Sequence, residues 1–257
     1  GKANSSNLKG VYVGKVNSRK RDQFDRRSRK LAEHPTEVFG IERVSPPSHS
    51  YKKNIIAKTP EQGRLIVALE HEGVSIAVGP AGTGKTYLSI AKAIESLEQG
   101  RVDRIVLCRP AIEAGETIGF LPGNIEAKLA PYLRPMYDVL TERLGAKRVK
   151  TLMAEGVIEI APIAYLRGRT FNNAFVVVDE AQNCTYIQLK MLVTRYGWNS
   201  TLVLAGDPDQ SDLLPGMSGL PELLGRLKSL PSVNIISFQK DDVIRHPLVA
   251  AMLEYLD

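Results

Sequence analysis

The chain has 257 residues, of which 43% are hydrophobic and 24% charged, and its formal net charge is +6. These values are ordinary for a soluble globular protein, and two cysteines in a chain of this length exclude a small disulfide-stapled scaffold. The chain has no run of about 18 uncharged apolar residues, so we expect no membrane span. Its first thirty residues are basic and contain no apolar stretch, so we expect no secretory signal. Because Cys108 and Cys184 need not pair, we expect a reducing cytoplasm.

The excess positive charge lies in the N-terminal part of the chain. Residues 1–43 contain 11 Lys and Arg against 5 Asp and Glu, whereas the two signs balance in the remainder. Seven of the thirteen residues from 18 to 30 are basic, which is typical of segments that bind the phosphate backbone of nucleic acids. A solvated, partly irregular tail is the alternative. Because the run Ser-Pro-Pro-Ser at 45–48 is typical of a linker, we expect a basic arm over residues 1–50 and a folded domain over residues 51–257.

Beyond the arm, short apolar runs alternate with helical patterns. We expect the first helix to begin after Thr59, an N-cap followed by Pro60, and to be ended by Gly73. Apolar, β-branched runs predict strands that are buried on both faces, over residues 75–78, 104–108, 157–160, 175–178, 201–205 and 234–238. Helices are expected between them, over residues 85–97, 126–143, 186–196, 220–230 and 247–256. This alternation predicts an α/β fold with a mostly parallel sheet, in which ligands bind at the carboxyl ends of the strands.

Residues 79–86 match the phosphate-binding pattern GxxxxGK[ST], and they lie between an apolar strand and an amphipathic helix. In such a loop the glycines let backbone N–H groups turn towards the phosphates, and the helix adds the positive end of its dipole. We expect Lys85 to neutralise the β- and γ-phosphates of ATP and the Thr86 hydroxyl to bind Mg²⁺. The predicted nucleotide-binding residues are Gly79, Pro80, Ala81, Gly82, Thr83, Gly84, Lys85 and Thr86.

Two further strands end in polar residues at the same edge of the predicted sheet. The strand at 175–178 is followed by Asp179, which we expect to hold Mg²⁺, and by Glu180, which we expect to act as the general base for an attacking water. Such a base favours a hydrolase over a phosphotransferase, and two acids that only cap the next helix are the alternative. The strand at 201–205 leads to Gln210, whose amide is suited to orient the water or sense the γ-phosphate, unless the segment is a plain turn.

Together these motifs resemble the PhoH family of P-loop ATPases over about residues 59–257. The resemblance rests on the phosphate loop and on further segments at residues 109–123, 165–171, 179–183, 206–210 and 242–247. It implies a single RecA-like core, ATP hydrolysis and an RNA-related role of the kind proposed for several family members. It also implies that Gln62 reads the adenine edge, for which a plain surface glutamine is the alternative. Arg109 becomes a candidate for contact with single-stranded nucleic acid, and Arg167 and Arg169 become candidates for contact with a phosphate or with a neighbouring subunit, for which plain surface arginines are the alternative.

A single RecA-like core lacks the arginine that a second core supplies in related helicases, so the resemblance favours an oligomer. We expect Arg245 to reach the ATP site of a neighbouring subunit in a ring, with a hexamer favoured; a helix-capping or ion-paired arginine is the alternative. The predicted function is thus a Mg²⁺-dependent ATPase that acts on RNA or single-stranded nucleic acid, as a helicase or translocase. A nucleotide-gated assembly protein without unwinding activity is the alternative.

Overall fold

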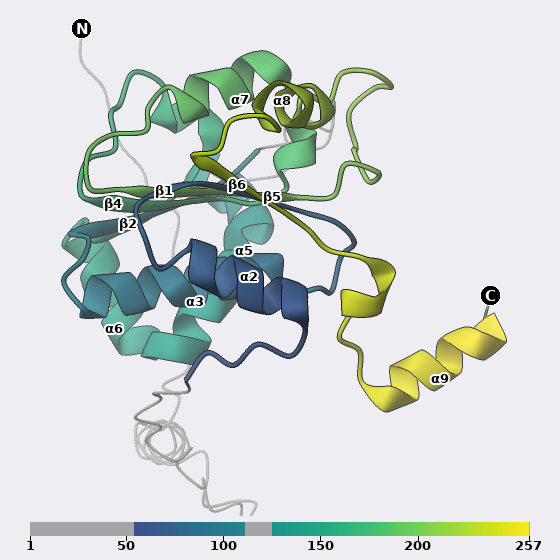
Figure 1. Ribbon diagram of the computed structural model, residues 1–257. Helices are drawn as coiled ribbons and strands as arrows, with labels where there is room; N and C mark the ends of the chain where they lie inside the picture. The colour runs from purple at the N-terminus through teal and green to yellow at the C-terminus, as the bar shows by residue number, and fades with distance from the viewer. Residues whose placement is uncertain (1–53, 111–124, 257) are drawn as a thin grey trace, which may run out of the picture. The chain divides into compact units, whose positions relative to one another are not determined.

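The computed structural model describes residues 54–110 and 125–256, which form an α/β unit (Figure 1). Its sheet has the strand order β3-β2-β4-β5-β1-β6, and each neighbouring pair is parallel. The strands are β1 (Gly73–Val78), β2 (Arg104–Arg109), β3 (Ile158–Pro162), β4 (Ala174–Val178), β5 (Thr201–Gly206) and β6 (Val233–Ser237). The predicted α/β class with a mostly parallel sheet is confirmed. The basic arm, its boundary near residue 50 and most of the segment 109–123 lie outside the described residues.

Helices cover both faces of the sheet (Figure 1). One face carries α2 (Pro60–Ala68), α3 (Lys85–Glu98), α5 (Ile125–Leu144) and α6 (Ala146–Ala154). The other face carries α7 (Tyr186–Val193) and α8 (Leu220–Leu227). Near the C-terminus, α9 (Pro247–Leu256) extends away from the sheet. Single turns of 3₁₀ helix follow three of the strands, at η1 (Ile163–Leu166), η2 (Ala181–Asn183) and η3 (Lys240–Asp242).

The first helix begins as the sequence predicts. The Thr59 side chain accepts a hydrogen bond from the backbone N–H of Gln62 at 3.3 Å, and Pro60 occupies the first helical position. The predicted end of this helix was wrong, since α2 stops at Ala68 and Gly73 instead begins β1. The chain therefore turns between α2 and β1 before it enters the sheet.

All six predicted strands are present, with ends shifted by at most two residues. Burial on both faces is confirmed for the central strands β4 and β5, whose residues are all buried. It was wrong for β3 and β6, because each lies at an edge of the sheet with only one neighbouring strand. Among the helices, α9 has its predicted ends, and α6 had not been predicted.

Two apolar clusters enclose the sheet, one on each face. Successive residues of β4 alternate between them, with Phe175 and Val177 in the cluster beneath α3 and Val176 and Val178 in the cluster beneath α7. These clusters fix the strand order and so the positions of the loops at the carboxyl ends of the strands. Within the described part of the chain, no helix is both long and apolar enough to cross a membrane.

Phe175 tests how far the central strand supports the fold. Its side chain is fully buried, so Phe175→Ala should lower the free energy of unfolding by about 3–5 kcal/mol, through lost apolar burial and the cavity left behind. Urea denaturation followed by circular dichroism measures this change. Ile187→Ala is the matched control, because the Ile187 side chain is 79% exposed. Equal stability of the two variants would contradict a core centred on β4.

Candidate nucleotide-binding site

The phosphate loop connects β1 to α3 and depends on glycines in the left-handed region of backbone space. The φ angles are 135° at Gly79, 80° at Gly82 and 86° at Gly84, a region that residues with a Cβ rarely adopt. A Cβ at Gly79 would also overlap the backbone carbonyl of Phe238. The loop therefore has the compact backbone turn that the sequence pattern predicts, directly before the N-terminus of α3.

The side chain of Lys85 folds back onto this loop. Its Nζ donates hydrogen bonds to the backbone oxygens of Gly79 and Pro80, each at 2.6 Å, and to the Thr83 hydroxyl at 3.1 Å. Burial lowers the pKa of the Lys85 ammonium below its usual value, while the carboxylates of Asp207, Asp179 and Glu180 oppose this change. A phosphate group in the loop would offer the ammonium a stronger, charged acceptor than the carbonyls it now contacts.

A hydrogen bond joins the phosphate loop to the end of β4. The Thr86 hydroxyl donates to Oδ1 of Asp179 at 2.5 Å. Asp179 is buried, and burial together with the charge of Glu180 raises its pKa, against the opposing effects of the Thr86 hydrogen bond and Arg109. A hydroxyl and a carboxylate are oxygen ligands of the kind that Mg²⁺ prefers, and a cation would offset the burial of this carboxylate. The two predicted metal ligands therefore fit Mg²⁺.

Glu180 follows Asp179 in an unusual backbone conformation. Its φ of 53° lies in the left-handed region, which is uncommon for a residue with a side chain and is concentrated at functional sites. Two side chains hold its carboxylate: Arg109 donates to Oε1 at 2.9 Å, and Gln182 donates to Oε2 at 2.5 Å. The predicted general base is thus fixed in orientation by neighbours from β2 and from η2.

Gln182 is a residue of this site to which the sequence analysis assigned no role. Its side chain is 2% exposed, and its Oε1 accepts a hydrogen bond from the backbone N–H of Asp207 at 3.0 Å. Its position three residues after Asp179, in a predicted strand-end motif, was the signal available in the sequence. Its contacts with Asp207 and Gln210 were not predictable, because these residues follow a different strand, β5.

A cavity of about 310 Å³ brings these groups together at the carboxyl ends of β1, β4 and β5. Its lining includes five residues of the phosphate loop, both acids of the β4 end, Gln210 and the buried Asp207, whereas Gly79, Pro80 and Thr83 of the loop do not line it. The complete lining is Ala81, Gly82, Gly84, Lys85, Thr86, Tyr87, Asp179, Glu180, Gly206, Asp207 and Gln210. The structure therefore collects residues from three separate strand ends around one opening beside the phosphate loop.

Gln62 lies against the outside of the phosphate loop and is not among the residues that line this cavity. Its buried amide donates to the backbone oxygen of Thr83 at 2.9 Å and accepts from the backbone N–H of Lys58 at 2.9 Å. The side chain thus supports the loop in this structure. Its predicted contact with adenine stays a prediction.

The four arginines singled out from the sequence have different surroundings. Arg109 lies beside the cavity, where it pairs with Glu180 and also donates to the backbone oxygen of Tyr132 at 3.1 Å. Arg169 forms two hydrogen bonds with Glu159, at 2.6 and 2.7 Å, and this pairing lowers the pKa of Glu159. Arg167 is exposed. The structure does not bring Arg167 or Arg169 into the cavity.

Arg245 is exposed and lies next to a segment that contacts the phosphate loop. The backbone N–H of the preceding residue, Ile244, donates to the backbone oxygen of Gly82 at 3.0 Å. Arg245 is not among the residues that line the cavity.

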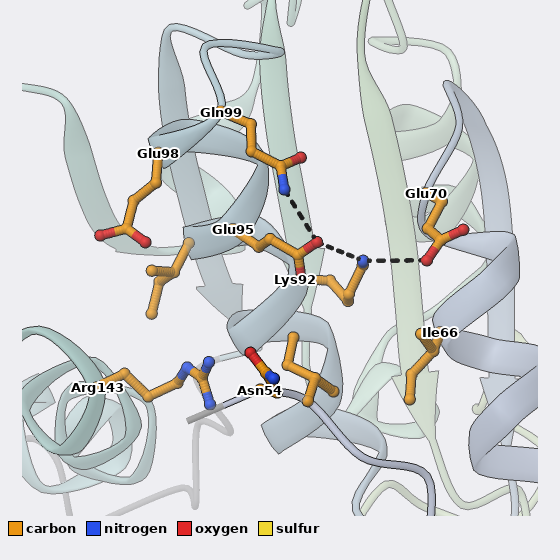
Figure 2. Close-up of a pocket in the computed structure, with 10 residues that line it drawn as sticks. Asn54, Ile66, Glu70, Lys92, Glu95, Glu98, Gln99 and Arg143 are labelled. Carbon is orange, nitrogen blue, oxygen red and sulfur yellow. Dashed lines mark hydrogen bonds and ion pairs between the residues drawn. The ribbon is translucent and has the colours of Figure 1, made fainter. Parts of the chain in front are cut away.

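A larger cavity of about 480 Å³ lies among α2, α3 and α5, and it shares no lining residue with the first (Figure 2). At its centre the Lys92 ammonium, with a side chain 2% exposed, pairs with Glu95 at 3.1 Å and Glu70 at 3.5 Å (Figure 2). Glu98 at its margin pairs with Arg148 at 2.9 Å. Its acids are thus matched by basic groups, and the phosphate loop lies elsewhere, so its larger volume does not make it the nucleotide site.

Comparison with known proteins places the chain among relatives of high identity. A family model described as "PhoH-like protein" matches residues 54–257. The chain is 47% identical over 206 residues to a PhoH-like protein of Bacillus subtilis (strain 168), covering 80% of this chain and 65% of that protein. It is 43% identical over 233 residues to protein PhoH of Escherichia coli (strain K12), covering 87% and 66%. The chain thus spans less than two thirds of the length of these relatives.

The solved structures that it resembles are more distant. They include the Sulfolobus solfataricus SWI2/SNF2 ATPase core in complex with dsDNA, with a TM-score of 0.43 and 16% identity over 78% of this chain and 52% of that chain. They also include the Pif1 helicase from Candida albicans, with a TM-score of 0.35 and 11% identity over 72% and 41%. Likeness at this level carries no argument about function. The family match covers nearly all the described residues and includes the phosphate loop and both strand-end motifs, and the chain therefore belongs to the PhoH-like protein family.

Proposed function

We propose that this nucleotide-binding P-loop protein is a Mg²⁺-dependent ATPase. The observation that carries the proposal is the hydrogen bond of 2.5 Å between Thr86 and Asp179, with Glu180 directly after Asp179 and facing the same cavity. Oxygen ligands for a cation, a lysine for the phosphates and a carboxylate for a water proton thus meet at one opening. This is the set of groups that hydrolysis of a phosphoanhydride requires.

In the proposed mechanism, the phosphate loop binds the phosphates of ATP and Lys85 neutralises charge on the β- and γ-phosphates. Thr86 and Asp179 would hold Mg²⁺, which supplies positive charge to the phosphoryl oxygens. Glu180 accepts a proton from the attacking water as the oxygen bonds to the γ-phosphorus and the bond to ADP breaks. Gln210, at the rim of the cavity, orients the water or senses the γ-phosphate through its amide.

We further propose that the ATPase acts on RNA or single-stranded nucleic acid. The support is the concentration of positive charge before residue 44 and the exposed Arg167 on the segment that follows β3. Lys and Arg residues bind phosphate backbones with release of counterions, whatever the base sequence. Arg169 contributes less support, because its guanidinium is already paired with Glu159.

The proposed assembly is a homo-oligomeric ring, with a hexamer favoured, in which Arg245 serves the ATP site of a neighbouring subunit. The support is the exposure of Arg245 and the hydrogen bond of the preceding Ile244 to the phosphate loop, which places this arginine next to a segment in contact with the loop. An arginine delivered to the transferring phosphoryl group stabilises its charge in the transition state.

Glu180→Gln tests the base. The substitution keeps the size of the side chain but removes the proton acceptor, so ATP should still bind while turnover falls by about 10²- to 10⁴-fold. Phosphate release and binding of a fluorescent ATP analogue measure the two effects separately. Lys85→Ala is the comparison, since it should lose binding as well as turnover. Unchanged phosphate release by Glu180→Gln would remove Glu180 from the mechanism, and nucleotide binding without hydrolysis by the unaltered protein would favour the nucleotide-gated assembly.

Arg245→Ala tests the ring. The substitution should lower turnover by about 10³- to 10⁵-fold if Arg245 supplies the transition-state charge. Mixing Arg245→Ala with Lys85→Ala subunits should then restore part of the activity, because an intact phosphate loop in one subunit meets an intact Arg245 in the next. Arg64→Ala, on the exposed surface of α2, should leave turnover unchanged. No gain of activity on mixing, or a monomer in sedimentation with ATP bound, would rule out the ring.

The basic arm is tested in the 257-residue chain by changing the seven Lys and Arg residues between 18 and 30 to Gln. Binding to single-stranded RNA should weaken, and the slope of log K against log salt should decrease by up to about 5, since each phosphate contact on a single strand contributes about 0.7. Fluorescence anisotropy across a salt series measures both quantities. Should affinity and slope stay the same, the nucleic-acid surface would have to lie outside this segment.

A further inference from the structure

Gln182 joins the ends of two strands that carry different parts of the site. On one side its Nε2 donates to Oε2 of Glu180 at 2.5 Å and to the backbone oxygen of Gln210 at 3.3 Å. On the other side its Oε1 accepts from the backbone N–H of Asp207 at 3.0 Å. Glu180 follows β4, whereas Asp207 and Gln210 follow β5. A single amide thus connects the candidate base to the segment that carries the candidate γ-phosphate sensor.

The chemistry of these contacts is specific to an amide. A backbone N–H needs an acceptor and a carboxylate needs a donor, and a primary amide offers both from one side chain. A glutamate at this position would face Glu180 with a second negative charge, and a methionine would offer neither bond. The orientation of the amide is set by the Asp207 N–H, which can only donate.

The packing around Gln182 leaves the amide little freedom. The side chain is 2% exposed, and a Cβ at Gly206 would lie 2.6 Å from its Oε1, so the oxygen packs directly against the glycine at the end of β5. The side chain is therefore held where its donor reaches Glu180. Glu180 itself has a φ of 53°, so its backbone depends on such surrounding contacts to keep this conformation.

We propose that Gln182 is a positioning residue of the ATPase. It fixes the carboxylate of the general base Glu180, and it makes the position of that carboxylate depend on Asp207 and Gln210, which follow β5. This inference rests on the proposed hydrolysis of ATP. Gln182 touches neither water nor phosphate in this mechanism and acts through Glu180. A base must lie within hydrogen-bond reach of the water it deprotonates, and a misplacement of about 1 Å can cost about 10²-fold in rate.

The neighbouring Asn183 provides a control for a purely structural role. It is also buried, and it also ties the η2 turn to the chain after β5: its amide donates to the Asp212 carboxylate at 3.0 Å, and its Oδ1 accepts from the Asp212 N–H at 2.8 Å. Its described side-chain hydrogen bonds do not involve Glu180, whose backbone oxygen accepts only from the Asn183 backbone N–H at 2.9 Å, a bond that a side-chain substitution keeps. If Gln182 only tethered the two segments, loss of the Asn183 tether should have the same effect on turnover.

The experiment compares Gln182→Met, Asn183→Leu, Glu180→Gln and the double variant Gln182→Met/Glu180→Gln in the 257-residue chain. Phosphate release gives kcat and KM, titration with a fluorescent ATP analogue gives Kd, and urea denaturation gives stability. Gln182→Met should lower kcat by about 10²-fold with Kd unchanged. Asn183→Leu should lose stability but turn over ATP at the wild-type rate. The double variant should be no slower than Glu180→Gln alone, because the two residues act as one unit.

The outcomes separate this inference from the proposed function. Wild-type kcat in Gln182→Met, with Glu180→Gln inactive, would overturn the positioning role and leave the ATPase in place. An equal loss of kcat in Asn183→Leu would also overturn it, in favour of a tether. A wild-type protein that binds ATP without hydrolysing it would overturn both proposals. If Gln182→Met does not fold, Gln182→Asn should show the same loss of kcat, because its amide is one methylene too short to reach both partners.

Discussion

The hydrogen bond between Thr86 and Asp179 is the contact on which the rest of the site depends. Its two residues lie 93 positions apart, at the start of α3 and after β4, and β5 separates their strands in the sheet. They meet because a parallel sheet places the carboxyl ends of its strands at one edge, and because the apolar clusters on both faces fix the strand order. The contact also places a buried carboxylate of raised pKa beside the phosphate loop, where a bound cation would stabilise it.

Most of the fold could be predicted because its central strands are continuous apolar runs. A strand such as β4 is buried on both faces, so its five residues alone mark its place in the sheet. The sequence was less informative where burial is partial. The helix α6 was missed because it is short and mostly polar: Val149, Leu152 and Met153 form its apolar stripe, and of these only Val149 is buried. The edge strand β6 was located, but its exposure follows from having a single neighbour, and a local pattern does not report that.

The residues of the site likewise differ in how well the sequence predicts them. The phosphate loop and the acids after β4 are contiguous in sequence, so their chemistry could be predicted from local motifs. The partners of Glu180 could not be predicted in this way. Arg109 comes from β2, and Gln182 is held by a second hydrogen bond, which it accepts from the Asp207 N–H at the end of β5. Gln62 is a similar case: its place on α2 was evident, but its contact with Thr83 depends on how α2 packs against the loop. Local motifs therefore do not predict that side chains from separate strand ends bind the same carboxylate, that of Glu180.

The hydrogen bond that Arg109 donates to Glu180 limits the contacts that Arg109 can make with other groups. One amino group of its guanidinium is bonded to Glu180 and the other to the Tyr132 backbone oxygen on α5, so both arms are committed within the site. Because its donors have a fixed planar geometry, a rotation that turns these two amino groups towards an external phosphate breaks at least one of these bonds, whereas contact through the remaining N–H groups keeps both. If the bond to Glu180 is the one released, Gln182 becomes the remaining protein donor that we identify on that carboxylate. Contact of these two amino groups with nucleic acid is therefore not independent of the position of the base: any phosphate that they bind is linked, through one side chain, to the group proposed to activate water.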